Sequence, residues 1–312
     1  MSQLKFLRAP FVSLQDAGRK GYFRYGIPPA GPMDWARHAM VNSMLNKPLS
    51  SAAIEIGPAG MSLSLDVGTL QVSFAGLKFK FLIDGERLPV PSRALLKAGQ
   101  TLEVIPLKGA MWSYLGLQAE IDIPEILGSQ SENSASGMRP VEITENTILP
   151  LKMKAPIKPY FQAVIDPYIT QQSQSIRILP STQYEDFSAK TQQSLVQVPW
   201  SIEPQFNRMA YRLNGTEIVC EQGHDILSDG ITMGAIQVPG DGKPIILMAD
   251  HQTTGGYPKI ACISKLDLPR LTQIAPKQFF MFQWQTVEQA RIEYMSMLKQ
   301  IQNLTALSVN LS

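Results

Sequence analysis

The chain has 312 residues and a formal net charge of +2 at pH 7, and 44% of its residues are hydrophobic while 17% are charged. These are values of a globular protein long enough for two domains, and so small a charge argues against a nucleic-acid or membrane-surface protein. No apolar stretch is long enough to span a bilayer, Lys5 and Arg8 interrupt the apolar N-terminal segment, and two cysteines are too few for a disulfide framework. We therefore expect a reduced, cytoplasmic protein.

The first half predicts alternating strands and one helix. Asp34 is a good N-cap, and the helix that it begins should run to about Asn46. Apolar and polar residues alternate over 70–74 and 79–83, and Asp84-Gly85 then gives a strong two-residue hairpin signal. Two stretches predict loops between the halves of the chain, which are the Ser-rich residues 128–137 and the Pro/Lys-rich residues 150–159.

The second half continues the β pattern. Residues 240–242 are Gly-Asp-Gly and predict a hairpin between the apolar runs 235–238 and 244–249, of which the second should be buried on both faces. Alternation returns over 280–284, and Thr286 with Gln289 forms a capping-box pattern before a C-terminal helix. The apolar stripe of that helix is Val287, Ala290, Tyr294, Leu298 and Ile301.

A faint internal repeat also indicates two similar domains. At a constant offset of 178, Pro91, Leu96, Gln100, Leu102 and Val104 match Pro269, Ile274, Gln278, Phe280 and Phe282. We predict a mainly β fold of small closed barrels with few helices, divided into residues 1–155, residues 156–285, and a C-terminal helix and tail over residues 286–312.

A polar loop follows the apolar run 244–249 and ends at Lys259. Its adjacent glycines allow backbone conformations that other residues resist, and successive N–H groups in such a loop can point at one anion. The side chains of Gln252, Thr253, Thr254 and Lys259 add donors to the same place. We expect a solvent-reachable loop at a pocket, with Arg208 or Arg212 nearby and the Lys259 ammonium exposed. A tight turn with a polar skin is an equally good interpretation of the pattern alone.

The remaining chemical patterns are weak. His38, His224 and His251 show no metal-ligand spacing with one another or with Cys262, and Cys220-x3-His224 supplies too few ligands for zinc. We predict no metal site. A Cys220/His224 nucleophile pair is conceivable, but a small buried cysteine near a surface histidine is the better interpretation.

Several blocks of the sequence together resemble one known family. The most specific is Gln252-Thr253-Thr254-Gly255-Gly256-Tyr257-Pro258-Lys259, which is preceded by Ala249-Asp250. Others are Arg208–Leu213 and an N-terminal motif containing Gln15-Asp16, Gly18-Arg19 and Met33-Asp34. They resemble the biotin-dependent carboxyltransferase-like family, which includes the C subunit of 5-oxoprolinase, KipA-type antagonists of a sporulation-kinase inhibitor, the carboxyltransferase domain of urea carboxylase, and proteins called allophanate hydrolase subunit 2.

The resemblance implies a fold and an activity. It implies two cyclophilin-like β-barrel domains and a role as the C subunit of an ATP-dependent 5-oxoprolinase, which cleaves 5-oxoproline to glutamate together with the A and B subunits. The partner would be a protein similar to the 5-oxoprolinase B subunit (KipI-like), possibly with the A subunit, and ATP would act in the complex. Biotin is unlikely, because no biotin-carrier context is present.

The resemblance also assigns roles to individual residues. The implied catalytic residues are Lys259, Thr253, Thr254 and Gln252. The implied substrate-binding residues are Gly255, Gly256, Tyr257, Arg208, Asn207 and Asp250. The implied pocket of the first domain contains Asp16, Arg19, Asp34 and Ser129.

Several positions depart from the family pattern. Where that pattern has Gly-Ser-Arg-Ser-Thr, this chain has Gly128-Ser129-Gln130-Ser131-Glu132, and where it has Gly-Ala-Asp, the chain has Gly76-Leu77-Lys78. Losing these donors puts catalytic competence in question. Two alternatives therefore stay open: a non-catalytic KipA-like protein that binds a KipI-like partner, and a carboxyltransferase that acts on a small amide with carboxybiotin.

Overall fold

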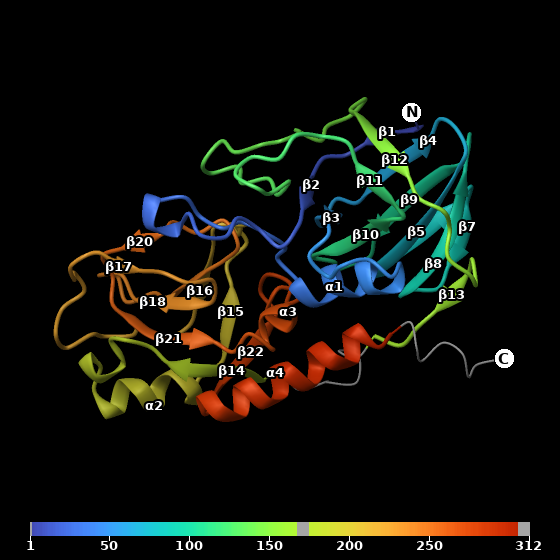
Figure 1. Cartoon of the computed structure of the whole chain (residues 1–312). Coiled ribbons are helices and arrows are strands. Elements are labelled where there is room, and N and C mark those ends of the chain that lie inside the picture. Colours follow the sequence, from blue (N-terminus) through green and yellow to red (C-terminus); the bar gives the residue numbers. More distant parts are fainter. Residues whose placement is uncertain (1, 167–174, 305–312) are drawn as a thin grey trace. The chain divides into compact units, whose positions relative to one another are not determined.

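The computed structural model describes residues 2–166 and 175–304 (Figure 1). The chain divides into two compact units. Unit 1 comprises residues 1–19, 30–170 and 298–312, and unit 2 comprises residues 20–29 and 171–297. This division differs from the predicted one, because residues 20–29 belong to unit 2 and residues 156–166 to unit 1. No helix among the described residues is long and apolar enough to cross a membrane.

Unit 1 is built from two sheets. The seven-stranded sheet has the order β11-β12-β1-β4-β9-β6-β7. Its strands are β1 (Ser2–Arg8), β4 (Met61–Leu65), β6 (Phe79–Ile83), β7 (Glu86–Leu88), β9 (Thr101–Pro106), β11 (Ala119–Ile121) and β12 (Ile148–Met153). The six-stranded sheet has the order β13-β8-β5-β10-β3-β2. Its strands are β2 (Val12–Gln15), β3 (Ala53–Ile56), β5 (Thr69–Gly76), β8 (Ser92–Lys97), β10 (Ser113–Leu117) and β13 (Gln162–Ala163).

The alternating pattern explains how these sheets bury their core. Phe79, Phe81 and Ile83 of β6 face inward, and the residues between them are half-buried. They join one hydrophobic cluster to which both sheets contribute. The predicted hairpin is confirmed, since β6 pairs antiparallel with β7 and both Asp84 and Gly85 have positive φ.

The predicted helix is α1 (Trp35–Met44), and Asp34 is its N-cap as expected. The Asp34 carboxylate accepts a hydrogen bond of 3.0 Å from the Arg37 N–H. All residues from Ala36 to Met44 are buried, and the Ser73 hydroxyl of β5 donates to the Val41 carbonyl at 2.7 Å. The helix is therefore an internal element of unit 1.

Unit 2 contains the closed barrel that the pattern predicts, with the order β14-β21-β18-β19-β16-β15-β22. Its strands are β14 (Ser175–Pro180), β15 (Trp200–Ile202), β16 (Ala210–Asn214), β18 (Ala235–Gln237), β19 (Ile245–Leu247), β21 (Lys259–Ile263) and β22 (Phe279–Trp284). A separate ribbon pairs β17 (Asp229–Gly230) with β20 (Thr254–Gly255). The hairpin around residues 240–242 is confirmed by the antiparallel pairing of β18 with β19.

Short helices complete unit 2. They are α2 (Ala189–Gln197), α3 (Leu268–Leu271), and the 3₁₀ turns η1 (Phe23–Tyr25) and η2 (Tyr184–Asp186). Among these, α2 and α3 were not predicted, because each is too short to show a sustained helical period.

The C-terminal helix α4 (Val287–Gln302) begins with the predicted capping box. The Thr286 hydroxyl accepts from the Gln289 N–H, and the Gln289 side chain accepts from the Thr286 N–H, both at 3.3 Å. One member of the predicted apolar stripe is wrong, since Val287 is 68% exposed while Ala290 and Ile301 are buried. Val287 is the first residue of α4, and the face of the helix that is buried at Ala290 and Ile301 is still exposed there.

Two other sequence interpretations need correction. Pro150 lies in β12, paired with β1, so the predicted loop over residues 150–159 begins later. The internal repeat does not extend over its full length, because Pro91 precedes strand β8 whereas Pro269 lies in helix α3. Only its last two positions fall in strands in both units, in β9 and β22.

Candidate functional site

The polar loop predicted from the sequence connects β19 to β21 in unit 2. Asp250 and His251 are buried at its start. The chain then forms β20, which pairs antiparallel with β17, and reaches β21 at Lys259. The loop is therefore part of a two-stranded ribbon on the barrel, and its backbone is held by strand pairing.

Side chains alternate between interior and solvent from His251 to Thr254. Gln252, Thr254 and Tyr257 are exposed, whereas Thr253 and Lys259 are buried. Alternation is expected of an extended strand, whose successive side chains point to opposite faces. The prediction of a solvent-reachable loop is thus confirmed for three side chains, and a pocket beside them stays a prediction.

Lys259 does not have the exposed ammonium that we expected. It is 4% exposed, and its Nζ donates to the Asp229 carboxylate at 2.5 Å and to the Gly230 carbonyl at 3.0 Å. Its backbone N–H donates to the Gln183 side chain at 3.3 Å. The hydrogen bond from Lys259 lowers the pKa of the Asp229 carboxyl. Lys259 therefore connects β21 to β17, and its charge is already balanced.

Gly255 is required by lack of space and not by an unusual backbone conformation. Neither Gly255 nor Gly256 has a positive φ, which corrects the expected reason for their presence. A Cβ on Gly255 would lie 2.6 Å from the Ile231 side chain and 2.8 Å from the Gln237 amide nitrogen. Gln237 also donates to the Tyr257 carbonyl at 3.2 Å, so close packing sets the path of the ribbon.

Arg208 lies at the start of the loop, as predicted. Its Nε and Nη2 donate to the two carboxylate oxygens of Asp250 at 3.1 and 2.9 Å, and the Arg208 carbonyl accepts from the Asp250 N–H at 2.8 Å. The Asn207 side-chain oxygen accepts hydrogen bonds from the N–H groups of Met209 and Ala210, two and three residues further on. Three predicted binding residues are thus brought together, and each contributes to holding the strand before the loop.

Arg212 and His251 have other surroundings. Arg212 pairs with Asp241 and Glu203. His251 is buried, its Nδ1 lies 2.6 Å from the Gln252 carbonyl, and its ring packs edge-on against Phe23 with centroids 6.3 Å apart. Burial lowers the pKa of His251, so the ring supports the loop as a neutral donor.

Asp229, Gln183 and Gln237 are the residues that sequence reasoning missed. They lie far from the loop in sequence, but each forms a hydrogen bond with a residue of the loop. Only Asp229 had a local signal, because Asp-Gly is a common turn pair. The sequence gives no sign that its carboxylate faces Lys259.

In unit 1, three of the four predicted pocket residues form a structural cluster. The Asp16 carboxylate accepts from the Ser129 and Ser131 hydroxyls, both at 2.7 Å, and from the Gln130 N–H at 2.7 Å. Arg19 is buried and donates to the Ser131 carbonyl at 2.6 Å. These contacts fix the loop that follows Leu127. A binding role for these residues stays a prediction.

The fourth residue, Asp34, belongs to a different buried cluster. Arg37 donates to Asp34 at 2.6 Å and to Asp166 at 2.8 Å, and all three side chains are at most 1% exposed. Burial of charges is tolerated here because each is paired. The Glu55 carboxylate accepts from the Met33 N–H at 2.8 Å and continues the network.

The departure at Gln130 has a structural explanation. Its side-chain amide donates to the Ile121 and Ile123 carbonyls at 3.0 and 3.1 Å. The Gln130 amide therefore binds two backbone carbonyls of the same chain. The family pattern described above has an arginine at this position. Among the described residues, no group of three or more His, Cys, Asp or Glu side chains could hold a metal ion.

Known proteins are similar to this chain in sequence and fold. The family model described as carboxyltransferase domain, subdomain A and B, matches residues 25–284. The chain is 32% identical to the C subunit of 5-oxoprolinase from Escherichia coli over 292 residues, which cover 92% of this chain and 93% of that protein. It is 31% identical to the C subunit of 5-oxoprolinase from Haemophilus influenzae, with 84% of each protein covered.

The similar solved structures are longer chains. The Kluyveromyces lactis urea amidolyase superposes with a TM-score of 0.87 at 22% identity, covering 97% of this chain and 20% of that one. The protein TTHA0988 superposes with a TM-score of 0.81 at 25% identity, covering 90% of this chain and 56% of that one. This chain thus spans little more than half of TTHA0988 and a fifth of the amidolyase.

Proposed function

Because this chain belongs to the family of carboxyltransferase domains with subdomains A and B, we propose that it is the C subunit of an ATP-dependent 5-oxoprolinase. In this proposal it cleaves 5-oxoproline to glutamate together with the A and B subunits and is active only in their complex. The observation that carries the proposal is its similarity to the C subunit of Escherichia coli 5-oxoprolinase along nearly the whole length of both proteins.

Residues exposed on the ribbon around β20 support this proposal. To open the lactam ring, a nucleophile adds to the carbonyl carbon, and negative charge develops on the carbonyl oxygen. The bond from that carbon to the ring nitrogen then breaks, and the nitrogen takes up a proton and leaves as the amine. Donors fixed in advance stabilise such charge. Thr254 presents an exposed hydroxyl on a ribbon that Lys259 and Gly255 hold in place. We assign Gln252, Thr254 and Tyr257 to substrate or partner contact, and Thr253, Lys259, Arg208, Asn207 and Asp250 to positioning.

The test is glutamate formation by the assembled complex. The chain is co-expressed with proteins similar to the A and B subunits of 5-oxoprolinase, and ATP-dependent release of glutamate from 5-oxoproline is measured. Thr254→Val should lower turnover about a hundredfold, the usual effect of losing one oxyanion donor. Thr216→Val, at another exposed threonine of unit 2, should leave turnover unchanged. A wild-type complex without ATP-dependent glutamate release would contradict the proposal.

A second candidate is a non-catalytic protein that binds a KipI-like partner, in the manner of KipA. Gln130 favours it, because a structural amide occupies a position that would otherwise supply a cation. Stable co-elution with the partner in size exclusion, without glutamate formation, distinguishes this candidate from the first.

A further inference from the structure

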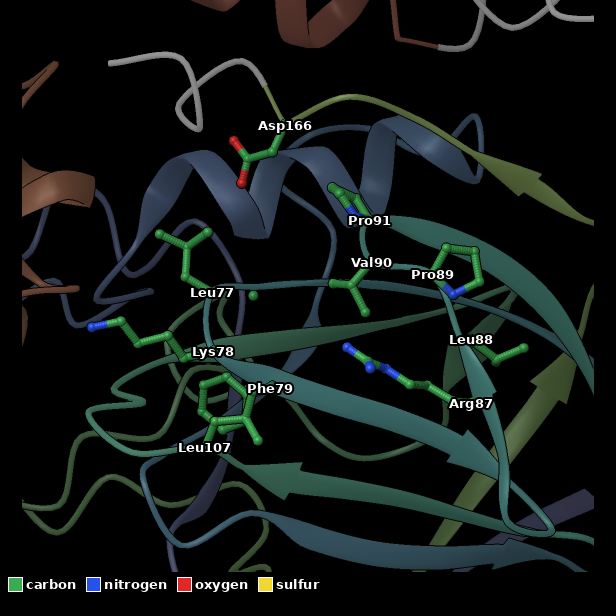
Figure 2. Close-up of a pocket in the computed structure, with 11 residues that line it drawn as sticks. Leu77, Lys78, Phe79, Arg87, Leu88, Pro89, Val90, Pro91, Leu107 and Asp166 are labelled. Atoms are coloured by element: carbon green, nitrogen blue, oxygen red, sulfur yellow. The ribbon is translucent and has the colours of Figure 1, made fainter. Parts of the chain in front are cut away.

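Unit 1 contains a cavity of about 400 Å³, and none of its lining residues belongs to unit 2. It opens where the turn from β5 to β6 meets the segment from β7 to β8 (Figure 2). Its lining residues are Gly76, Leu77, Lys78, Phe79, Arg87, Leu88, Pro89, Val90, Pro91, Leu107 and Asp166. A volume of this size is at the small end of the range of ligand sites, about 300–1,000 Å³.

The walls of the cavity are held by hydrogen bonds. The Leu107 N–H donates to the Lys78 carbonyl at 2.7 Å. On the opposite wall, the Ser92 hydroxyl donates to the Pro89 carbonyl at 2.5 Å, and the Val164 N–H donates to the Pro91 carbonyl at 3.1 Å. The cavity is therefore preformed and does not need a ligand to shape it.

Most of the side chains that line the cavity are apolar, and Arg87 and Lys78 add positive charge. Phe79 is 4% exposed, and Leu88 and Val90 pack against the core of unit 1. Figure 2 shows the Arg87 side chain extending from β7 among these residues, with its guanidinium group near the middle of the lining. Lys78 stands at the rim with a positive φ of 59°, a conformation that side-chain-bearing residues seldom adopt.

The cavity has an excess of positive charge, because its one acidic residue, Asp166, is paired with Arg37. Asp166 is 1% exposed and already accepts from Arg37 at 2.8 and 3.0 Å. Arg87 and Lys78 are exposed, and neither side chain makes an ion pair or hydrogen bond within the described part of the chain. A planar guanidinium matches a carboxylate by two parallel hydrogen bonds, and the apolar walls suit a compact hydrocarbon body.

We propose that this cavity binds a small organic carboxylate with a compact apolar body, with Arg87 contacting the carboxylate and Lys78 adding charge at the rim. The inference does not rest on the proposed 5-oxoprolinase activity, because every residue involved lies in unit 1 of this chain and no partner is required.

The test is isothermal titration calorimetry of the full chain with benzoate, with the neutral isostere benzamide, and with inorganic phosphate. Benzoate should bind saturably with a millimolar or lower Kd, and the other two should bind at least about tenfold more weakly. Arg87→Gln should weaken benzoate binding about tenfold or more, as expected for a charged hydrogen bond. Lys78→Gly, which retains the positive φ, should weaken it less.

Lys80→Gln is the matched control, because Lys80 lies on the same strand as Phe79 but does not line the cavity. It should keep wild-type affinity, and the melting temperature of each variant should stay near that of the wild type. Any one of three results overturns the proposal: no saturable benzoate binding, benzamide or phosphate binding as tightly as benzoate, or wild-type benzoate affinity in Arg87→Gln.

Discussion

The ammonium group of Lys259 lies inside unit 2, where Asp229 and Gly230 accept its hydrogen bonds. Lys259→Ala removes these bonds together with the buried aliphatic stem. We expect it to lower the free energy of unfolding by about 1–3 kcal/mol, the range for losing a charged hydrogen bond with buried surface. Urea unfolding of the purified chain measures this.

Lys243→Ala is the control, because Lys243 is an exposed lysine of the same unit. It should change the free energy of unfolding by less than about 0.5 kcal/mol. If Lys259→Ala behaves like this control while abolishing turnover of the assembled complex, then Lys259 acts as a catalytic donor and the positioning role assigned to it is wrong.

Gly255 is constrained by its neighbours. Gly255→Ala would place a methyl group 2.6 Å from the Ile231 side chain, and the resulting overpacking should cost about 1–3 kcal/mol of stability. Gly230→Ala, on the paired strand β17, meets nothing within 4 Å and should be nearly neutral. The two melting temperatures test this, and equal values would show that the ribbon can shift to accept a side chain.

At the scale of elements, the Asp16 carboxylate fixes the loop that follows Leu127 through bonds from two hydroxyls and two N–H groups. The two donors besides Ser129 and Ser131 are the N–H groups of Gly18 and Gln130, at 2.8 and 2.7 Å. Asp16→Ala leaves these donors without their acceptor, so we expect about 2–4 kcal/mol of destabilisation.

Limited proteolysis should detect that change locally. Cleavage within residues 126–137 should become faster in Asp16→Ala than in Glu142→Ala, which removes a carboxylate that is 64% exposed. Equal cleavage rates would mean that strand pairing, and not the carboxylate, holds this loop.

Elements with a long regular pattern could be predicted from the sequence. The strands β5, β6 and β22, the helix α1 and the capping box of α4 all have strong local signals, and the structure confirms them. Elements that depend on distant partners could not. The strand β20 has only two residues, and its partner β17 precedes it by more than twenty positions, so no local period marks either one.

At the scale of the whole molecule, the candidate site could also be predicted only in part, because its geometry depends on residues that are distant in the sequence. The sequence indicates which residue types occupy the loop, and so predicts its chemistry. It does not indicate which face each side chain takes, because the register of β20 against β17 decides that Thr254 is exposed and Thr253 buried. Nor does it show the division of the chain, since residues 20–29 join unit 2 by contacts far along the sequence.

Acid should destabilise both units, because each contains a buried neutral histidine. Burial lowers the pKa of His38 in unit 1 from 6.5 to about 4, and burial also lowers the pKa of His251 in unit 2. Between pH 6.5 and about 4, the unfolded chain takes up a proton at His38 that the folded chain does not. The stability that neutral His38 contributes is therefore complete above pH 6.5 and is lost as the pH falls toward 4, by up to about 3 kcal/mol.

His38→Gln tests this prediction, because glutamine does not titrate and can still donate to the Gln15 carbonyl, which lies 3.0 Å from the His38 Nε2. The free energy of unfolding, measured at several values between pH 4 and 7, should depend less steeply on pH in this variant than in the wild type. An unchanged slope in His38→Gln would mean that His38 takes up its proton as readily in the folded chain as in the unfolded chain, and the prediction would be wrong.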